Sequence, residues 1–159
     1  MALTRSNTQM DIIDLIKDEH RNFDTLFSVI ETTDDIQKLY DYFNKLYEQI
    51  NLHAGVREQI FYPVIREYED TNEIVAQAQK QQNTIKELLE EIESFSPTSA
   101  EFKQKIHQLK EVMQHQAQEE ENQILLQVRN SMNATEREQL GKEFTSFKSK
   151  FQNEIKGLN

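Results

Sequence analysis

Apolar side chains recur every three or four residues along most of the chain, which is the pattern of helices that bury one face. The first helix is predicted over about residues 10–31, with the stripe Ile16, His20, Phe23, Phe27 and Ile30. A second helix is expected from an N-cap at Asp34. Its stripe is Leu39, Phe43, Leu46, Ile50, His53, Arg57, Ile60 and Val64. His53 and Arg57 therefore lie one turn apart on a face that is otherwise apolar.

Two more helices are predicted from the same spacing. The third has Asp70 as its expected N-cap and buries Ile74, Ala78, Ile85, Leu89 and Ile92. A connector containing Ser and Pro follows, and Thr98 with Glu101 then forms a capping-box pattern that opens a fourth helix reaching about Asn130. The inner face of this fourth helix is predicted to carry Val112, His115, Glu119 and Leu126.

A fifth helix is expected from Thr135, with Glu138 as its capping partner. Its stripe is Leu140, Phe144, Phe147, Phe151 and Ile155. Four striped helices with short connections predict an all-α fold, an antiparallel up-and-down four-helix bundle. The fifth helix should pack across the outside. We expect one domain over residues 1–159, with the bundle at about 10–130 and the additional C-terminal helix at about 135–156.

Charge and composition narrow the range of partners and locations. The formal net charge is -10 with no basic block, so we expect neither nucleic acid nor an acidic membrane surface as a partner. No apolar run approaches the roughly 20 residues of a membrane span, and no signal peptide is evident. These features predict a cytoplasmic protein. Because the chain has no cysteine, any metal must be held by histidine and carboxylate.

Polar residues on the inner faces are the candidates for chemistry. Three of the four histidines lie on predicted inner faces of three different helices, and a glutamate lies one turn after the last of them. Helical bundles build metal sites from such inward side chains. Imidazole nitrogen with carboxylate oxygen suits iron, zinc, manganese or copper. The candidate metal ligands are His20, His53, His115 and Glu119.

Three motifs resemble the hemerythrin family, in its HHE cation-binding branch. They are "DEHRNF" around His20, "H…FYPVI" from His53 to Ile65, and "HQAQEEENQILL" from His115 to Leu126. The resemblance covers about residues 10–156. It implies a bundle with a non-haem di-iron centre that binds dioxygen or serves iron and redox sensing. The implied ligands are a His from each of the four helices, a bridging Glu from the second and a carboxylate from the fourth.

Two of the ligand positions implied by the resemblance hold other residues. The four candidate ligands match the family pattern, but Arg57 stands where the bridging carboxylate is expected, and Gln82 stands where the third helix should supply a histidine. Glu58 is the nearest acid, five residues after His53, and would point inward only if the helix bulged near Gly55. The site is therefore expected to hold one metal at most.

Arg57 needs a partner wherever it is buried. A guanidinium stays charged in proteins, and a buried unpaired charge costs several kcal/mol. We expect Glu119 or Glu58 to pair with it. The acids beside the first histidine, Asp18 and Glu19, are expected on a solvent-exposed flank.

Three functional interpretations follow. The first is a hemerythrin-like protein with a reduced non-haem site, binding one metal, iron in the first place, in a sensing or redox role with dioxygen or nitric oxide as ligand. The second is a metal-free bundle that acts as a regulatory or scaffolding module with a protein partner. The third is a mononuclear non-haem iron oxidative enzyme. The absence of a nucleophile and base pair and of a phosphate loop favours the non-enzymatic interpretations.

Overall fold

All regular structure in the described residues, 11–157, is helical. The computed structural model describes side chains up to residue 154, so the predicted contribution of Ile155 and the predicted start at Met10 lie outside this description. The helices are α2 (Ile12–Thr32), α3 (Ile36–Val56), α4 (Tyr62–Ile65), α5 (Asn72–Glu93), α6 (Ala100–Glu119), α7 (Leu125–Ser131) and α8 (Ala134–Gly157). Two π-helical turns, η1 (Arg57–Phe61) and η2 (Glu120–Ile124), join α3 to α4 and α6 to α7. The all-α prediction is confirmed.

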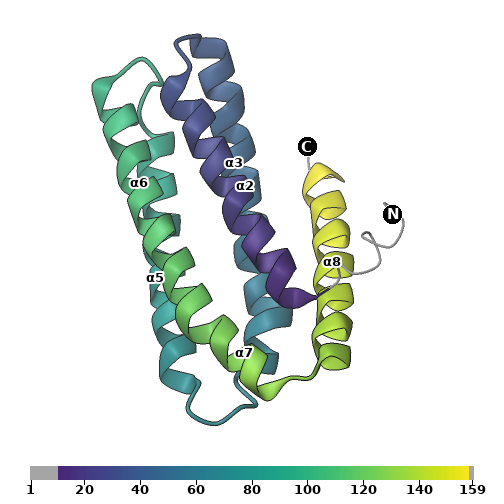
Figure 1. The fold of residues 1–159 in the computed structure, drawn as a ribbon. Helices are drawn as coiled ribbons and strands as arrows, with labels where there is room; N and C mark the ends of the chain where they lie inside the picture. Colours follow the sequence, from purple (N-terminus) through teal and green to yellow (C-terminus); the bar gives the residue numbers. More distant parts are fainter. Residues whose placement is uncertain (1–10, 158–159) are drawn as a thin grey trace.

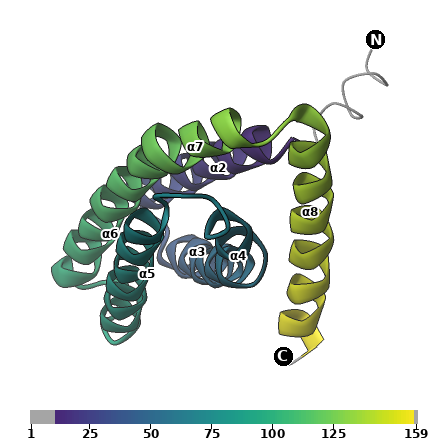
Figure 2. The ribbon, with the colours of Figure 1, turned by 90° about the horizontal axis from the view of Figure 1, so that it is seen from below.

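The long helices form a bundle with one further helix on its outside. In Figure 1, α2, α3, α5 and α6 run side by side, with α2 against α3 and α6 and with α5 against α6. Figure 2 shows α8 on the flank away from α5, where it contacts α2, α3 and η1. Gly55 permits this approach, since a Cβ there would lie 3.2 Å from the Phe151 ring. The predicted position of the fifth helix is confirmed. None of the described helices is both long and apolar enough to cross a membrane.

The apolar core is divided into two clusters by a polar layer. One cluster contains Phe23, Phe27, Leu46, Ile50, Ile85, Leu89, Leu109 and Met113, and the other contains Ile16, Val56, Phe61, Ala78, Ile124, Leu125 and Phe144. The buried polar side chains between them are Glu19, His20, His53, Arg57, Gln82, Gln116 and Glu120. The chain thus passes from one apolar cluster to the other through this layer along α2, along α3 with η1, along α5, and along α6 with its continuation η2 and α7.

Both π-helical turns begin at residues of the polar layer. The Tyr62 N–H donates to the Arg57 carbonyl and the Leu125 N–H to the Glu120 carbonyl, each five residues back. Pro63, which has no N–H, follows the first turn and favours this local irregularity. A π turn inserts one extra residue into the helical repeat and often occurs at functional sites. The two turns therefore mark the layer as the candidate site.

The first π turn also changes which residues are buried after it. Phe61 and Ile65 are buried, whereas the predicted stripe placed Ile60 and Val64 inward. That part of the prediction is wrong by one residue because a regular α-helical repeat was assumed through residue 57.

Several helix starts also differ from the predicted ones. The observed caps are Asp11, Asp35, Ser99 and Asn133, the last in a reciprocal pair with Glu136. The predicted caps Asp34, Thr98 and Thr135 were wrong by one or two residues, because adjacent residues of the same capping type compete for the position. Asp70 is likewise replaced by Thr71 immediately before α5.

Candidate functional site

Arg57 is the centre of the polar layer and is completely buried. Its Nε donates to Glu120 Oε2 at 2.9 Å, and its Nη2 donates to Glu120 Oε1 at 2.9 Å. The same Nη2 lies 2.8 Å from Glu19 Oε1. The guanidinium carbon is 5.6 Å from the ring centroids of both Phe61 and Phe144. A bidentate contact of this kind is the strongest form of carboxylate recognition available to arginine.

Glu19 joins Arg57 to His53. Burial raises the pKa of Glu19, but the Arg57 charge and the His53 contact outweigh it and hold that pKa well below its usual range. Because the carboxylate is ionised, His53 Nδ1 is the donor in the 2.5 Å contact to Glu19 Oε1. Burial and the Arg57 charge lower the pKa of His53, which is therefore neutral. Lys148 on α8 completes the group, with Nζ 3.2 Å from Glu19 Oε2.

His20 bridges two carboxylates of η2. Its Nε2 lies 2.9 Å from Glu120 Oε1 and its Nδ1 lies 2.6 Å from Glu121 Oε2. Both nitrogens can donate only in the imidazolium form. Burial lowers the pKa of His20, but the hydrogen bond to Glu120 and the charge of Glu120 outweigh it, so the pKa is raised. Burial also raises the pKa of Glu120, but the Arg57 charge and the hydrogen bond from His20 outweigh burial and lower that pKa.

With these protonation states the layer balances its own charge. The cations are Arg57, His20 and Lys148, and the anions are Glu19, Glu120 and Glu121. Buried ions are tolerated when partners of opposite charge compensate their lost hydration. We call these six residues and His53 the arginine cluster.

The arginine cluster contains metal-binding residue types, but their arrangement does not fit a metal ion. Imidazole and carboxylate are suitable donors. Both Glu120 oxygens, however, already accept from Arg57, and Glu19 Oε1 faces the same guanidinium. Among the described residues, no group of three or more His, Cys, Asp or Glu side chains is placed to hold a metal. A permanent cation thus stands between the carboxylates that a metal would need.

Little free space lies beside the two histidines of the cluster. A cavity of about 20 Å³ is bordered by His20, His53 and Gln116. That volume holds about one water molecule. His53 lines this cavity, and its Nε2 atom has no hydrogen-bond partner in the described part of the chain. The cavity is too small for an organic substrate.

The structure brings together two of the four predicted ligands. His20 and His53 belong to the cluster, whereas His115 is 66% exposed and pairs with Glu119 at 3.0 Å along the surface of α6. The predicted inner face of this helix was wrong by one residue, since Gln116 and Glu120 are the buried side chains. One residue corresponds to about 100° of rotation around a helix. Metal binding by the four predicted residues stays a prediction.

The predicted environment of Arg57 was also wrong in part. Its partners are Glu120 and Glu19, not Glu119 or Glu58. Glu58 remains exposed and accepts from Gln79, so the π turn does not carry it inward. The expectation that Glu19 lies on a solvent-exposed flank fails because α8 covers that flank and Lys148 contacts the carboxylate.

Comparison with known proteins gives a family and one relative of similar sequence. Residues 11–128 match the model of the hemerythrin HHE cation-binding domain. The chain is also 32% identical over 161 residues to a protein named DNA nickase from Nostoc sp. (strain PCC 7120), an alignment that covers 98% of this chain and 45% of that protein. The chain thus spans just under half the length of this relative. No solved structure matches.

The relative corrects one prediction, and the family model confirms another. The exclusion of nucleic acid rested on the net charge and on the absence of a basic block, and the similarity to a protein named for its action on DNA contradicts it. The predicted resemblance is confirmed by a match that begins at the N-cap of α2 and ends in α7. This chain belongs to the hemerythrin family, as a member with an HHE cation-binding domain.

Proposed function

We propose that this chain is a metal-independent hemerythrin-fold module in which the arginine cluster takes the place of an ion, and that it acts as a regulatory or scaffolding module. The observation that supports this most directly is the contact of Arg57 with both Glu120 oxygens and with Glu19. The guanidinium supplies in covalent form the positive charge that a cation would bring to these carboxylates. The fold then needs no metal to compensate them.

The contacts of the carboxylates and the size of the cavity beside the histidines favour this interpretation over the other two. A mononuclear iron site, with dioxygen or nitric oxide as ligand, requires carboxylate lone pairs and open positions beside the histidines. In the arginine cluster those lone pairs accept from Arg57 and His20. The 20 Å³ cavity that His20 and His53 line leaves no room for an oxidisable substrate beside the two histidines. A role carried by the surface of the bundle is the interpretation that remains compatible with both features.

Metal analysis tests this proposal directly. Protein purified without oxygen from an iron-supplemented host is expected to contain substoichiometric iron, manganese, zinc and copper. Its thermal midpoint should be the same in EDTA as in excess ferrous ion, since a ligand stabilises a fold only by binding it. Elemental analysis and a thermal melt followed by circular dichroism provide the two readouts. One metal per chain, with a midpoint that falls in EDTA, would favour the mononuclear site instead.

A second candidate function is DNA processing, and the similarity to the Nostoc protein favours it. The net charge of -10 opposes contact with phosphates at low ionic strength. A divalent cation in solution, or the other half of a longer protein, would have to offset this repulsion. This chain, which aligns with just under half of the Nostoc protein, would then either cut DNA itself or regulate another part that does.

A plasmid assay distinguishes these two forms of the candidate. If this chain itself cuts DNA, the purified protein converts supercoiled plasmid to the open-circular form in the presence of Mg²⁺ or Mn²⁺. Gel electrophoresis measures the conversion, with EDTA and heat-denatured protein as controls. No open circles at a molar excess of protein would count against cutting by this chain and leave regulation as the form of the candidate to pursue.

A further inference from the structure

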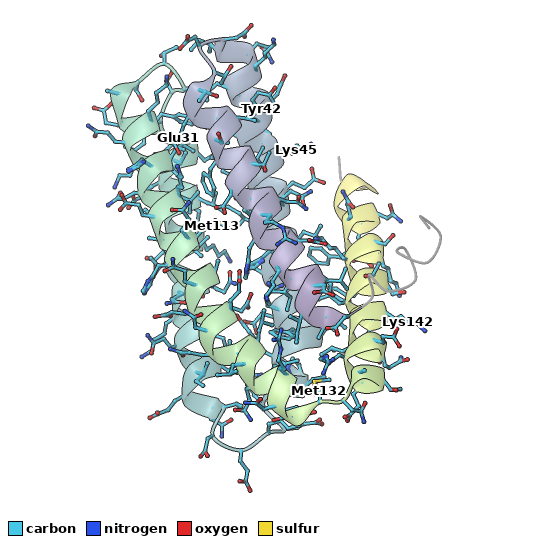
Figure 3. All side chains as sticks on the ribbon, viewed as in Figure 1. Glu31, Tyr42, Lys45, Met113, Met132 and Lys142 are labelled. Atoms are coloured by element: carbon cyan, nitrogen blue, oxygen red, sulfur yellow. The ribbon has the colours of Figure 1, made fainter. Side chains whose placement is uncertain are left out.

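A second recess lies on the α8 side of the bundle, outside the small cavity beside the histidines. It has a volume of about 420 Å³ and is formed by side chains of α2, α3 and α8. Ligand pockets in proteins usually measure about 300–1,000 Å³. Figure 3 shows Tyr42 and Lys45 of α3 on this side of the bundle. We call this recess the α8 groove.

The wall of the α8 groove combines an apolar part with polar side chains, and its charged groups are mainly basic. Leu26, Val29 and Tyr42 are half-buried and supply the apolar surface. Lys45 is exposed and takes part in no ion pair within the described residues, while Lys148 lies at the inner end. This is an excess of positive charge on a chain whose formal net charge is -10.

Among the described residues, Glu19 is the one acid that lines the α8 groove, and it is already compensated. Glu19 accepts from Arg57 and His53 through Oε1 and from Lys148 through Oε2. An anion in the groove would therefore meet the unpaired Lys45 ammonium and the Lys148 ammonium, which it would share with Glu19, and no free carboxylate among the described residues that line the groove. A cation would meet Lys45 and Lys148 without an acid left to receive it, which makes an anion the complementary ligand.

We propose that the α8 groove binds a small organic carboxylate with an apolar body, its carboxylate held by Lys45 and Lys148 and its body lying against Leu26, Val29 and Tyr42. This inference goes beyond the proposed function and does not depend on whether the arginine cluster binds metal. The ligand carboxylate shares the Lys148 ammonium with Glu19. Binding is thereby coupled to the arginine cluster, because Glu19 then depends more on Arg57 and His53.

Octanoate is a suitable probe, followed by two-dimensional amide NMR of the full chain. The proposal expects saturable shifts in α2, α3 and α8 around the groove, together with a shift of the His53 ring resonances. Acetate lacks the apolar body and octan-1-ol lacks the charge, so each should bind about tenfold or more weakly. Equal affinity for octanoate and octan-1-ol would overturn the role of the lysines, and shifts remote from the groove would overturn its location.

Variants test the two ammonium groups separately. Lys148→Met and Lys45→Met are each expected to weaken octanoate binding about tenfold, the effect of losing one hydrogen bond to a charged group. Lys142→Met is the matched control, since Lys142 is an exposed α8 lysine that does not line the groove (Figure 3). Lys45→Met remains informative if Lys148→Met unfolds. Wild-type affinity in Lys45→Met, or an equal loss in Lys142→Met, would overturn the proposal.

Discussion

Replacing Arg57 by methionine is expected to destabilise the fold by about 3–5 kcal/mol, the range for breaking a buried ion pair by removing one partner. Methionine keeps much of the apolar stem but leaves Glu120 and Glu19 without their shared cation. The free energy of unfolding in urea, followed by circular dichroism, measures the loss. If the variant unfolds at room temperature, Arg57→Lys should be intermediate, since lysine keeps the charge but loses the bidentate contact.

The matched control is an arginine on the surface of α2. Arg21 pairs with Asp18, and both side chains are largely exposed. Arg21→Met should therefore cost at most about 1 kcal/mol. Combining Arg57→Met with Glu120→Gln should recover part of the loss, because one of the two stranded carboxylate charges is then removed as well. A free energy of unfolding for Arg57→Met within about 0.5 kcal/mol of the wild type would mean that the carboxylates do not depend on this arginine.

The bundle and three of the seven residues of the arginine cluster could be predicted because they follow a local rule. His20, His53 and Arg57 interrupt apolar stripes with helical spacing, and residues on a stripe face inward whatever their chemistry. The family resemblance indicates in addition that Arg57 and Gln82 occupy ligand positions. Those two positions are buried in the structure as well.

The other four residues of the cluster depend on helix phase and on a distant helix. On α6 the apolar line through Leu109 and Met113 continues to Gln116 and Glu120, so helical spacing along this line indicates the acid that pairs with Arg57. The predicted line through His115 lies about 100° away around the helix. Glu19 lies three residues after Ile16 and four before Phe23, so helical spacing alone also places it on a buried line of α2. Its contact with Lys148 comes from α8, more than a hundred residues later. Long-range cover of this kind is not contained in a local pattern.

Introducing a carboxylate in place of Arg57 should make the cluster bind a metal cation where the wild type has the guanidinium. In Arg57→Glu combined with Gln82→His, the guanidinium is lost, a third acid joins Glu19 and Glu120, and an imidazole is offered from α5. Gln82 suits this exchange, since it is 8% exposed and its Nε2 has no hydrogen-bond partner among the described residues. The metal-free variant should be less stable than Arg57→Met, because the added negative charge repels two buried carboxylates.

A divalent cation is then expected to raise the stability of this double variant, whereas we expect it to have no effect on the parent chain. At a free concentration of a hundred times the dissociation constant, binding contributes about 2.7 kcal/mol. Elemental analysis should find bound iron, and EDTA should lower the thermal midpoint of this variant alone. Arg57→Gln with Gln82→His is the matched control, because it removes the guanidinium without adding a carboxylate and should gain little metal. If the Arg57→Glu variant binds no more metal than the parent, Arg57 is not what keeps an ion out of the polar layer, and the account of the arginine as a replacement for the ion fails.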